Sequence, residues 1–240
     1  MSAGRFVWFE LVTKDVEDGV AFWTKVVALT RKDMDMGSFA YPMLHQGETA
    51  FAGVVPPQME GVPPHWLSYW SVDDVDARTA KVEGAGGTVI VGPTDIPTVG
   101  RFSLISDPQG AVVALFKGLD ASEPAVRPMS WVELWSKDVD AVLPFYTSLL
   151  DLEVEAMTMP AGPYHILKAG EVQVGGAMTS PNPDAPAMWL PYLTVTDLDA
   201  ALAAVQDAEG ALLVDPMSVE GVGRFAVVAD RQGAALGLLQ

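Results

Sequence analysis

The chain has 240 residues and no cysteine, and its 31 acidic and 14 basic residues give a net charge of −17. The lack of cysteine excludes disulfides and zinc–thiolate sites, and the negative charge disfavours nucleic acid and anionic lipid as partners. No apolar run approaches the roughly 20 residues of a membrane-spanning helix, and no secretory signal is evident. We therefore expect a cytoplasmic protein without nucleic-acid or membrane partners.

The first predicted strand lies in WFELVTKDV, residues 8–16, and this sequence returns as WVELWSKDV at residues 131–139. The same shift of 123 residues carries Tyr41 to Tyr164 and relates many other positions of the two halves. A shift that stays constant along the chain indicates a duplicated domain. We predict one domain over residues 1–117, a linker over 118–129 and a second domain over 130–240.

Each half contains the same predicted elements twice. Residues 6–12 alternate as in a strand, and Asp15 can cap a helix whose apolar stripe includes Val20 and Phe22. The segment HWLSYWSVDDVDARTAKVEGAGG repeats the order of strand, aspartate, helix and glycine stop. Short strand candidates follow each helix, so the chain contains four strand–helix–three-strand units. Pro144 lies inside the third predicted helix, where it should kink the segment.

Two of the four units close on related sequences, SDPQGAVVALF at 106–116 and ADRQGAALGLL at 229–239. With the opening motifs, these resemble the vicinal oxygen chelate superfamily of glyoxalases, bleomycin-resistance proteins and extradiol dioxygenases. PPHWLSYWSVDDVDA and PTDIPTVGRF resemble its tandem-domain subgroup, described as 27 kDa antigens or hydroxylases. The resemblance implies an α+β fold with two similar glyoxalase-like domains. Each would be a curled mixed sheet around a cup, with its helices outside.

The resemblance also places the family's metal ligands on particular residues of this chain. Divalent cations need oxygen, nitrogen or sulfur donors, and indole, aliphatic and glycine positions supply none. We therefore expect neither a metal nor another cofactor. The corresponding positions are Trp8, Leu67 and Ala114 in the first half, and Trp131, Leu190 and Gly237 in the second.

Two glutamates are the candidate functional groups. Glu10 and Glu133 each follow the first lost ligand position by two residues, so the resemblance implies that they point into the cups. His65 could assist Glu10, and the small Ala114 and Gly237 would leave open volume. Alternatively, the glutamates are structural and pair with Arg101, Arg224 or backbone amides. The expected ligand-binding residues are Trp8, Leu67, Tyr69, Ala114, Phe116, Trp131, Trp135, Leu190, Tyr192 and Gly237.

We predict a metal-free protein that binds a small apolar or aromatic molecule for sequestration or resistance. The alternative is a metal-independent isomerase, cyclase, lyase or hydrolase in which Glu10 or Glu133 is the general base. A metal-dependent lyase or dioxygenase is disfavoured by the lost ligands, and a scaffold without a ligand is a further alternative. The sequence leaves open a monomer or a homodimer, and whether units 1 and 2 or units 1 and 4 pack together.

Overall fold

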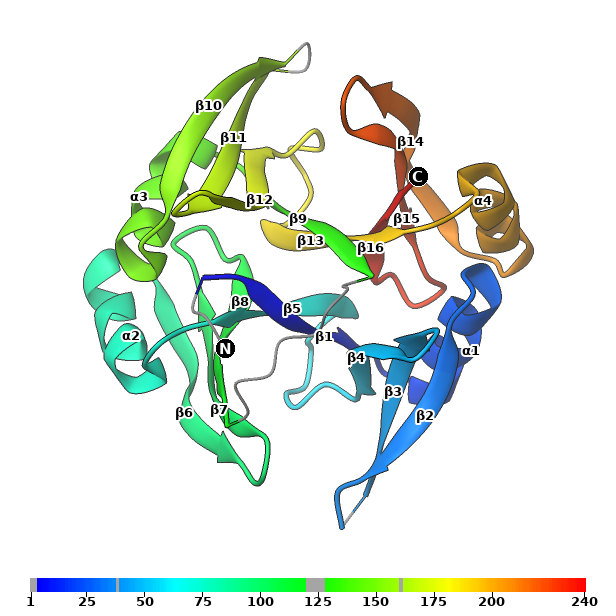
Figure 1. Ribbon diagram of the computed structural model, residues 1–240, viewed down its shortest axis with the longest axis horizontal. Coiled ribbons are helices and arrows are strands. Elements are labelled where there is room, and N and C mark those ends of the chain that lie inside the picture. Colours follow the sequence, from blue (N-terminus) through cyan, green and yellow to red (C-terminus); the bar gives the residue numbers. More distant parts are fainter. Residues whose placement is uncertain (1–3, 38, 120–127, 160–161) are drawn as a thin grey trace. The chain divides into compact units, whose positions relative to one another are not determined.

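The computed structural model describes residues 4–37, 39–119, 128–159 and 162–240. Most of the predicted linker at 118–129 lies outside these residues. The described chain consists of four β-α-β-β-β modules, coloured in sequence order in Figure 1. This order confirms the four predicted units.

The modules have the following elements. The first has β1 (Phe6–Val12), α1 (Val16–Val26), β2 (Thr30–Asp35), β3 (Ala40–Gln46) and β4 (Thr49–Val55). The second has β5 (His65–Ser71), α2 (Val75–Val82), the 3-10 helix η1 (Glu83–Ala85), β6 (Thr88–Ile96), β7 (Gly100–Ser106) and β8 (Val112–Gly118). The third has β9 (Met129–Ser136), α3 (Val139–Leu150), β10 (Glu153–Met159), β11 (Gly162–Ala169) and β12 (Val172–Thr179). The fourth has β13 (Met188–Thr194), α4 (Leu198–Asp207), β14 (Ala211–Val219), β15 (Gly223–Ala229) and β16 (Ala235–Leu239).

The strands form two mixed eight-stranded sheets. Their orders are β2-β3-β4-β1-β5-β8-β7-β6 and β10-β11-β12-β9-β13-β16-β15-β14, so the second sheet repeats the first. Within each module the first strand pairs in parallel with the last, and the other pairs are antiparallel. The predicted α+β class with two similar domains is therefore correct.

An aspartate begins every α-helix of the described chain. The side chains of Asp15, Asp74, Asp138 and Asp197 each accept a hydrogen bond from a backbone N–H in the first turn. Such caps satisfy amide groups that the helix itself leaves without acceptors. Pro144 does not end α3, which continues through it to Leu150. No described helix is long and apolar enough to cross a membrane.

Contacts divide the chain into two compact units. The first comprises residues 1–7, 68–123 and 131–189, and therefore most of the second and third modules. The second comprises residues 8–67, 124–130 and 190–240, and therefore most of the first and fourth modules. Backbone pairing thus joins modules 1 and 2 in one sheet, whereas compact packing groups module 1 with module 4.

In the first compact unit, α2 packs against α3 and against β6, β7 and β8 (Figure 1). The turn after β7 stabilises this packing through hydrogen bonds to the third module. The buried Asp107 accepts a hydrogen bond from Tyr146 Oη of α3 (2.9 Å), which itself accepts one from Trp189 Nε1 (2.9 Å). The Gln109 side chain binds both the backbone N–H (2.9 Å) and the carbonyl (2.5 Å) of Asp138.

The second compact unit repeats this arrangement with α1 packed against α4. The buried Asp230 accepts a hydrogen bond directly from Trp23 Nε1 of α1 (3.2 Å), and the Trp23 ring meets the Trp66 ring edge to face. The Gln232 side chain binds the backbone N–H (2.9 Å) and carbonyl (2.8 Å) of Asp15. The family-like Asp-x-Gln-Gly turns are therefore packing elements, and each holds the start of a helix from another module.

Candidate functional site

Three side chains of the first module form a hydrogen-bonded chain in the second compact unit. Trp8 Nε1 donates to Tyr41 Oη (3.0 Å), and Tyr41 Oη donates to Glu10 Oε1 (2.7 Å). Trp8 and Glu10 lie on the same face of β1 because side chains of a strand alternate between its faces. All three side chains are partly buried. We call these three residues the Glu10 cluster.

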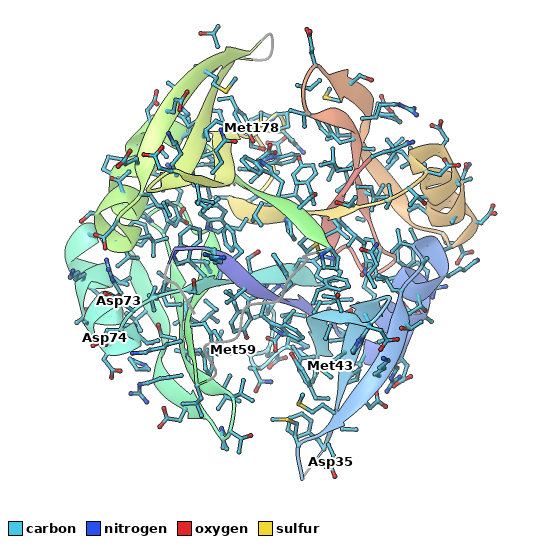
Figure 2. The ribbon with its side chains drawn as sticks, viewed as in Figure 1. Asp35, Met43, Met59, Asp73, Asp74 and Met178 are labelled. Carbon is cyan, nitrogen blue, oxygen red and sulfur yellow. The ribbon has the colours of Figure 1, made fainter. Side chains whose placement is uncertain are left out.

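The register of the sheet explains how Tyr41 reaches Glu10. Gly53 of β4 pairs with Glu10 of β1 on one side and with Met43 of β3, labelled in Figure 2, on the other. The Tyr41 ring crosses the space above Gly53, where a Cβ atom would lie 1.8 Å from its hydroxyl oxygen. A side chain at position 53 would therefore displace the tyrosine from the glutamate.

The third module contains the same arrangement in the first compact unit. Trp131 Nε1 donates to Tyr164 Oη (2.8 Å), which donates to Glu133 Oε1 (2.7 Å). Gly176 pairs with Glu133, and a Cβ atom on it would lie 1.9 Å from Tyr164 Oη. We call Trp131, Glu133 and Tyr164 the Glu133 cluster.

One further residue distinguishes the Glu133 cluster. Trp135 Nε1 donates to the second carboxylate oxygen, Glu133 Oε2, at 2.8 Å. Trp135 is paired in the sheet with Met178 of β12, which is labelled in Figure 2. Glu133 and Trp135 are both buried, with exposed fractions of 9 % and 7 %. The residue that corresponds to Trp135 in the first module is Val12, whose aliphatic side chain has no donor.

Burial, followed by the negative charge of the adjacent glutamate, raises the pKa of Tyr41 and of Tyr164 above the ordinary value. Both hydroxyls therefore remain protonated at neutral pH and act as donors to the carboxylates. Because the tryptophan N–H groups can only donate, the hydrogen bonds of each cluster run from tryptophan through tyrosine to glutamate.

Arg101 and Arg224, which the predicted structural alternative paired with the glutamates, bind aspartates instead. Arg101 binds Asp76 (2.7 Å) and Asp95 (2.7 Å), both exposed on the surface. Arg224 binds Asp199 at 2.9 Å. Tyr41 and Tyr164, which the candidate list lacked, donate hydrogen bonds to the two glutamates. Their only signal in the sequence was that Tyr41 and Tyr164 obey the repeat.

Three of the predicted residues of the second module, Tyr69, Ala114 and Phe116, lie in the first compact unit, whereas His65 and Leu67 belong to the second. Tyr69 of β5 pairs in register with Ala114 of β8, and its ring contacts those of Phe102 and Phe116 at centroid distances of 6.5 and 6.1 Å. Ala114 is fully buried. These residues therefore form an aromatic layer on β5, β7 and β8.

The equivalent residues of the fourth module lie in the second compact unit. Tyr192 of β13 pairs with Gly237 of β16, and the Tyr192 ring contacts the Phe225 ring at 5.9 Å. A Cβ atom on Gly237 would lie 2.2 Å from Cδ1 of Tyr192. The tyrosine ring therefore fills the space expected to be open above this glycine.

His65 begins β5, and its Nδ1 lies 2.9 Å from the carbonyl oxygen of Pro63. Burial lowers the pKa of His65, so its ring is neutral at pH 7. A neutral ring that donates from Nδ1 to the carbonyl carries its lone pair on Nε2. Leu67 and Leu190 are buried, with exposed fractions of 6 % and 1 %.

The residues at the family's metal positions do not fit a metal ion. The two indole nitrogens, on Trp8 and Trp131, carry protons that are donated to tyrosines, so they offer no lone pair. The other four positions have aliphatic side chains or none. Among the residues that the structure describes, no three histidine, aspartate or glutamate side chains are gathered as a metal site would require.

An open depression lies elsewhere, along the turn between β14 and β15. It is lined by residues 218–224 and by Gln240. None of the predicted site residues lines it.

Comparison with known proteins agrees with the fold and the repeat. The model of the Glyoxalase/Bleomycin resistance protein/Dioxygenase superfamily matches twice, at residues 5–115 and 129–238. “Putative glyoxylase CFP32” of Mycobacterium tuberculosis is 36% identical over 243 residues, covering 97% of this chain and 93% of the relative. “Anthracycline biosynthesis protein DnrV” of Streptomyces peucetius is 29% identical over 264 residues, covering 99% of this chain and 93% of the relative.

Solved structures share the fold at low sequence identity. The Mn(II)-bound glyoxalase from Novosphingobium aromaticivorans has a TM-score of 0.67 at 14% identity, covering 98% of this chain and 81% of that one. The 2,3-dioxygenase LapB from Pseudomonas sp. KL28 has a TM-score of 0.65 at 11% identity, covering 100% of this chain and 92% of that one.

Proposed function

The chain belongs to the Glyoxalase/Bleomycin resistance protein/Dioxygenase superfamily, and we propose that it binds a small apolar or aromatic molecule without a metal ion, for sequestration or resistance. The observation that carries this proposal is a carboxylate that accepts a hydrogen bond from a tyrosine, which itself accepts one from a tryptophan. This carboxylate lies two residues from a position where the family has a metal ligand. Binding would occur at one or both glutamate clusters.

The hydrogen bonds of the cluster limit the chemistry of the ligand. An ionised carboxylate accepts hydrogen bonds only, and the tyrosine already directs its proton to it. A polar group of the ligand that reaches the carboxylate must therefore be a donor, such as a hydroxyl or a protonated amine. The indole ring of Trp8 supplies a flat apolar surface for the rest of the molecule.

The test is isothermal titration of the purified chain with 2-naphthol, an aromatic molecule with one hydroxyl donor. We expect saturable binding that weakens about 10- to 100-fold on Glu10→Gln or Glu133→Gln, because a hydrogen bond to a charged group contributes about 1.5–3 kcal/mol. Glu48→Gln is the matched control, since Glu48 is exposed and paired with Lys32. Equal affinity in both cluster variants and the wild type would refute the proposal.

A second candidate function is a metal-independent enzyme with one of these glutamates as general base. Two observations favour it: the carboxylate is held in one position by Tyr41, and one relative is named for the biosynthesis of anthracyclines. A base must lie within hydrogen-bond reach of the proton that it removes. Incubation with hydroxylated polycyclic aromatic compounds, followed by mass spectrometry, separates the two functions. Conversion that Glu10→Gln abolishes would favour the enzyme, and recovery of the unchanged compound would favour the binding protein.

A further inference from the structure

The hairpin of β14 and β15 gathers exposed apolar side chains in the second compact unit. Ten large apolar side chains are exposed in the described part of the chain, and four of them lie within residues 212–222. They are Leu212, Leu213, Met217 and Val222, with exposed fractions of 48, 53, 47 and 59 %. We call these four residues the hairpin patch. Single exposed apolar residues are normal on a protein, whereas a group of them marks a contact surface.

The duplicated chain contains a reference for this hairpin. The hairpin of β6 and β7 has the same register shifts at the equivalent positions. At the shift of 123 residues, Met217 corresponds to Thr94 of β6. Ser218 corresponds to Asp95, which binds Arg101 at 2.7 Å on the surface of the second module. The fourth module therefore has a methionine and a serine where the second has a polar and a charged side chain. An exposed methionine gains nothing from water, so this difference favours a surface that another molecule covers.

Charge indicates which molecule covers the patch. β14 is the last strand of its sheet (Figure 1), and Asp215 is the one charged residue among its nine. The edge strand β10 has two glutamates among seven residues, and the edge strand β2 has four charged residues among six. Charges on an edge oppose association, and a net charge of −17 repels a second copy over most of the surface. The uncharged patch is where two copies can meet with little repulsion.

The shape of the hairpin also suits a second copy. The open depression lined by residues 218–224 and Gln240 lies directly beside the patch, since Met217 precedes its first residue and Val222 is part of its lining. A twofold axis brings one surface against its own copy, so that each contact occurs twice. A surface that has both exposed apolar side chains and a hollow can be complementary to itself in this way.

We infer that the hairpin patch is the contact surface of a homodimer, in which each copy places apolar side chains of β14 over the depression of the other. The inference is independent of the proposed function. Pro216 and two register shifts interrupt β14, so the copies meet through side chains and not through a continuous backbone ladder. Four half-exposed side chains offer a few hundred Å² per copy, below the roughly 800 Å² per partner of a standard interface. The dimer should therefore be reversible, with a dissociation constant in the micromolar range.

Sedimentation velocity of the full chain between about 1 and about 200 µM tests the association. We expect the dimer to grow with concentration and to strengthen from about 0.15 M to about 1 M NaCl, because salt screens the repulsion between the copies. The double variant Met217→Thr, Ser218→Asp carries the residues of the second module and should weaken the dimer by at least about 10-fold. Met59→Thr is the matched control. Met59, labelled in Figure 2, has an exposed fraction of 48 % and lies outside the hairpin.

Cross-linking locates the surface. The chain has no cysteine, so Val222→Cys and Met59→Cys each introduce a single thiol. A bis-maleimide should link Val222→Cys into dimers and leave Met59→Cys monomeric. A wild type that stays monomeric over the whole concentration range would overturn the inference, and so would a double variant that dimerises as tightly as the wild type. Equal linking of both cysteine variants, or a dimer that salt weakens, would also contradict it. The wild-type measurements and the cysteine variants keep the test valid if the double variant does not fold.

Discussion

Alkaline conditions should destabilise this protein through three tyrosines. Burial is the main cause that raises the pKa of Tyr41, Tyr146 and Tyr164, and a neighbouring carboxylate adds to it in each case. Below about pH 10 both the folded and the unfolded chain keep these protons, so the contribution to stability is fully present. As the pH rises further, the unfolded chain ionises first, and stability is lost.

The magnitude follows from the ordinary tyrosine pKa of about 10. Between about pH 9 and about pH 11, each tyrosine that keeps its proton in the folded state lowers the free energy of unfolding by about 1.4 kcal/mol. The three together should account for about 4 kcal/mol. Tyr41→Phe should reduce this fall in the free energy of unfolding by about 1.4 kcal/mol, and Tyr164→Phe should have the same effect.

The assay is urea unfolding at the two pH values, followed by tryptophan fluorescence. Other titrating groups affect wild type and variant alike, so they cancel in the comparison. Trp8→Phe is the control, because it removes the hydrogen bond to Tyr41 but keeps the titrating hydroxyl, and it should show the fall of the wild type. The free energy of unfolding could instead fall by the same amount in Tyr41→Phe and in the wild type between the two pH values. Tyr41 would then ionise as readily in the folded chain as in the unfolded one, and the geometry of the Glu10 cluster would be refuted.

Three other predictions concern the framework of the site. Gly53→Ala should destabilise the chain by about 2–4 kcal/mol, because its Cβ displaces Tyr41 from Glu10; Gly92→Ala, which meets no atom within 4 Å, should be nearly neutral in the same urea titration. Gln232→Ala should cost about 1–3 kcal/mol through its lost bonds to the backbone of Asp15, as measured by urea unfolding, and an unchanged midpoint would contradict the fastening role of this turn. EDTA should leave the melting temperature unchanged, since the family's ligand positions offer no donors; a fall of several degrees would point to a metal site elsewhere in the chain.

The sequence alone determined the modular organisation of this protein. A constant shift between halves, strand alternation, aspartate caps and glycine stops are local patterns, and each of them follows from the chemistry of neighbouring residues. The absence of donors at positions such as Trp8 and Ala114 was likewise evident, because a metal ligand is a property of a residue type. The strand face on which the Glu10 side chain lies followed from the alternation of side chains along a strand.

The tertiary structure decided what these residues contact. Tyr41 lies 31 positions from Glu10 in the chain, and only the register of β3, β4 and β1 brings the two together over Gly53. Whether a small residue leaves a space or is covered by a neighbour depends on the ring across the sheet, as Tyr192 over Gly237 demonstrates. Strand periodicity states which face a side chain occupies, but its partner on that face is set by register and by the direction of long side chains. For this reason the tyrosines of the two clusters, and the role of Trp135, emerged only from the folded chain.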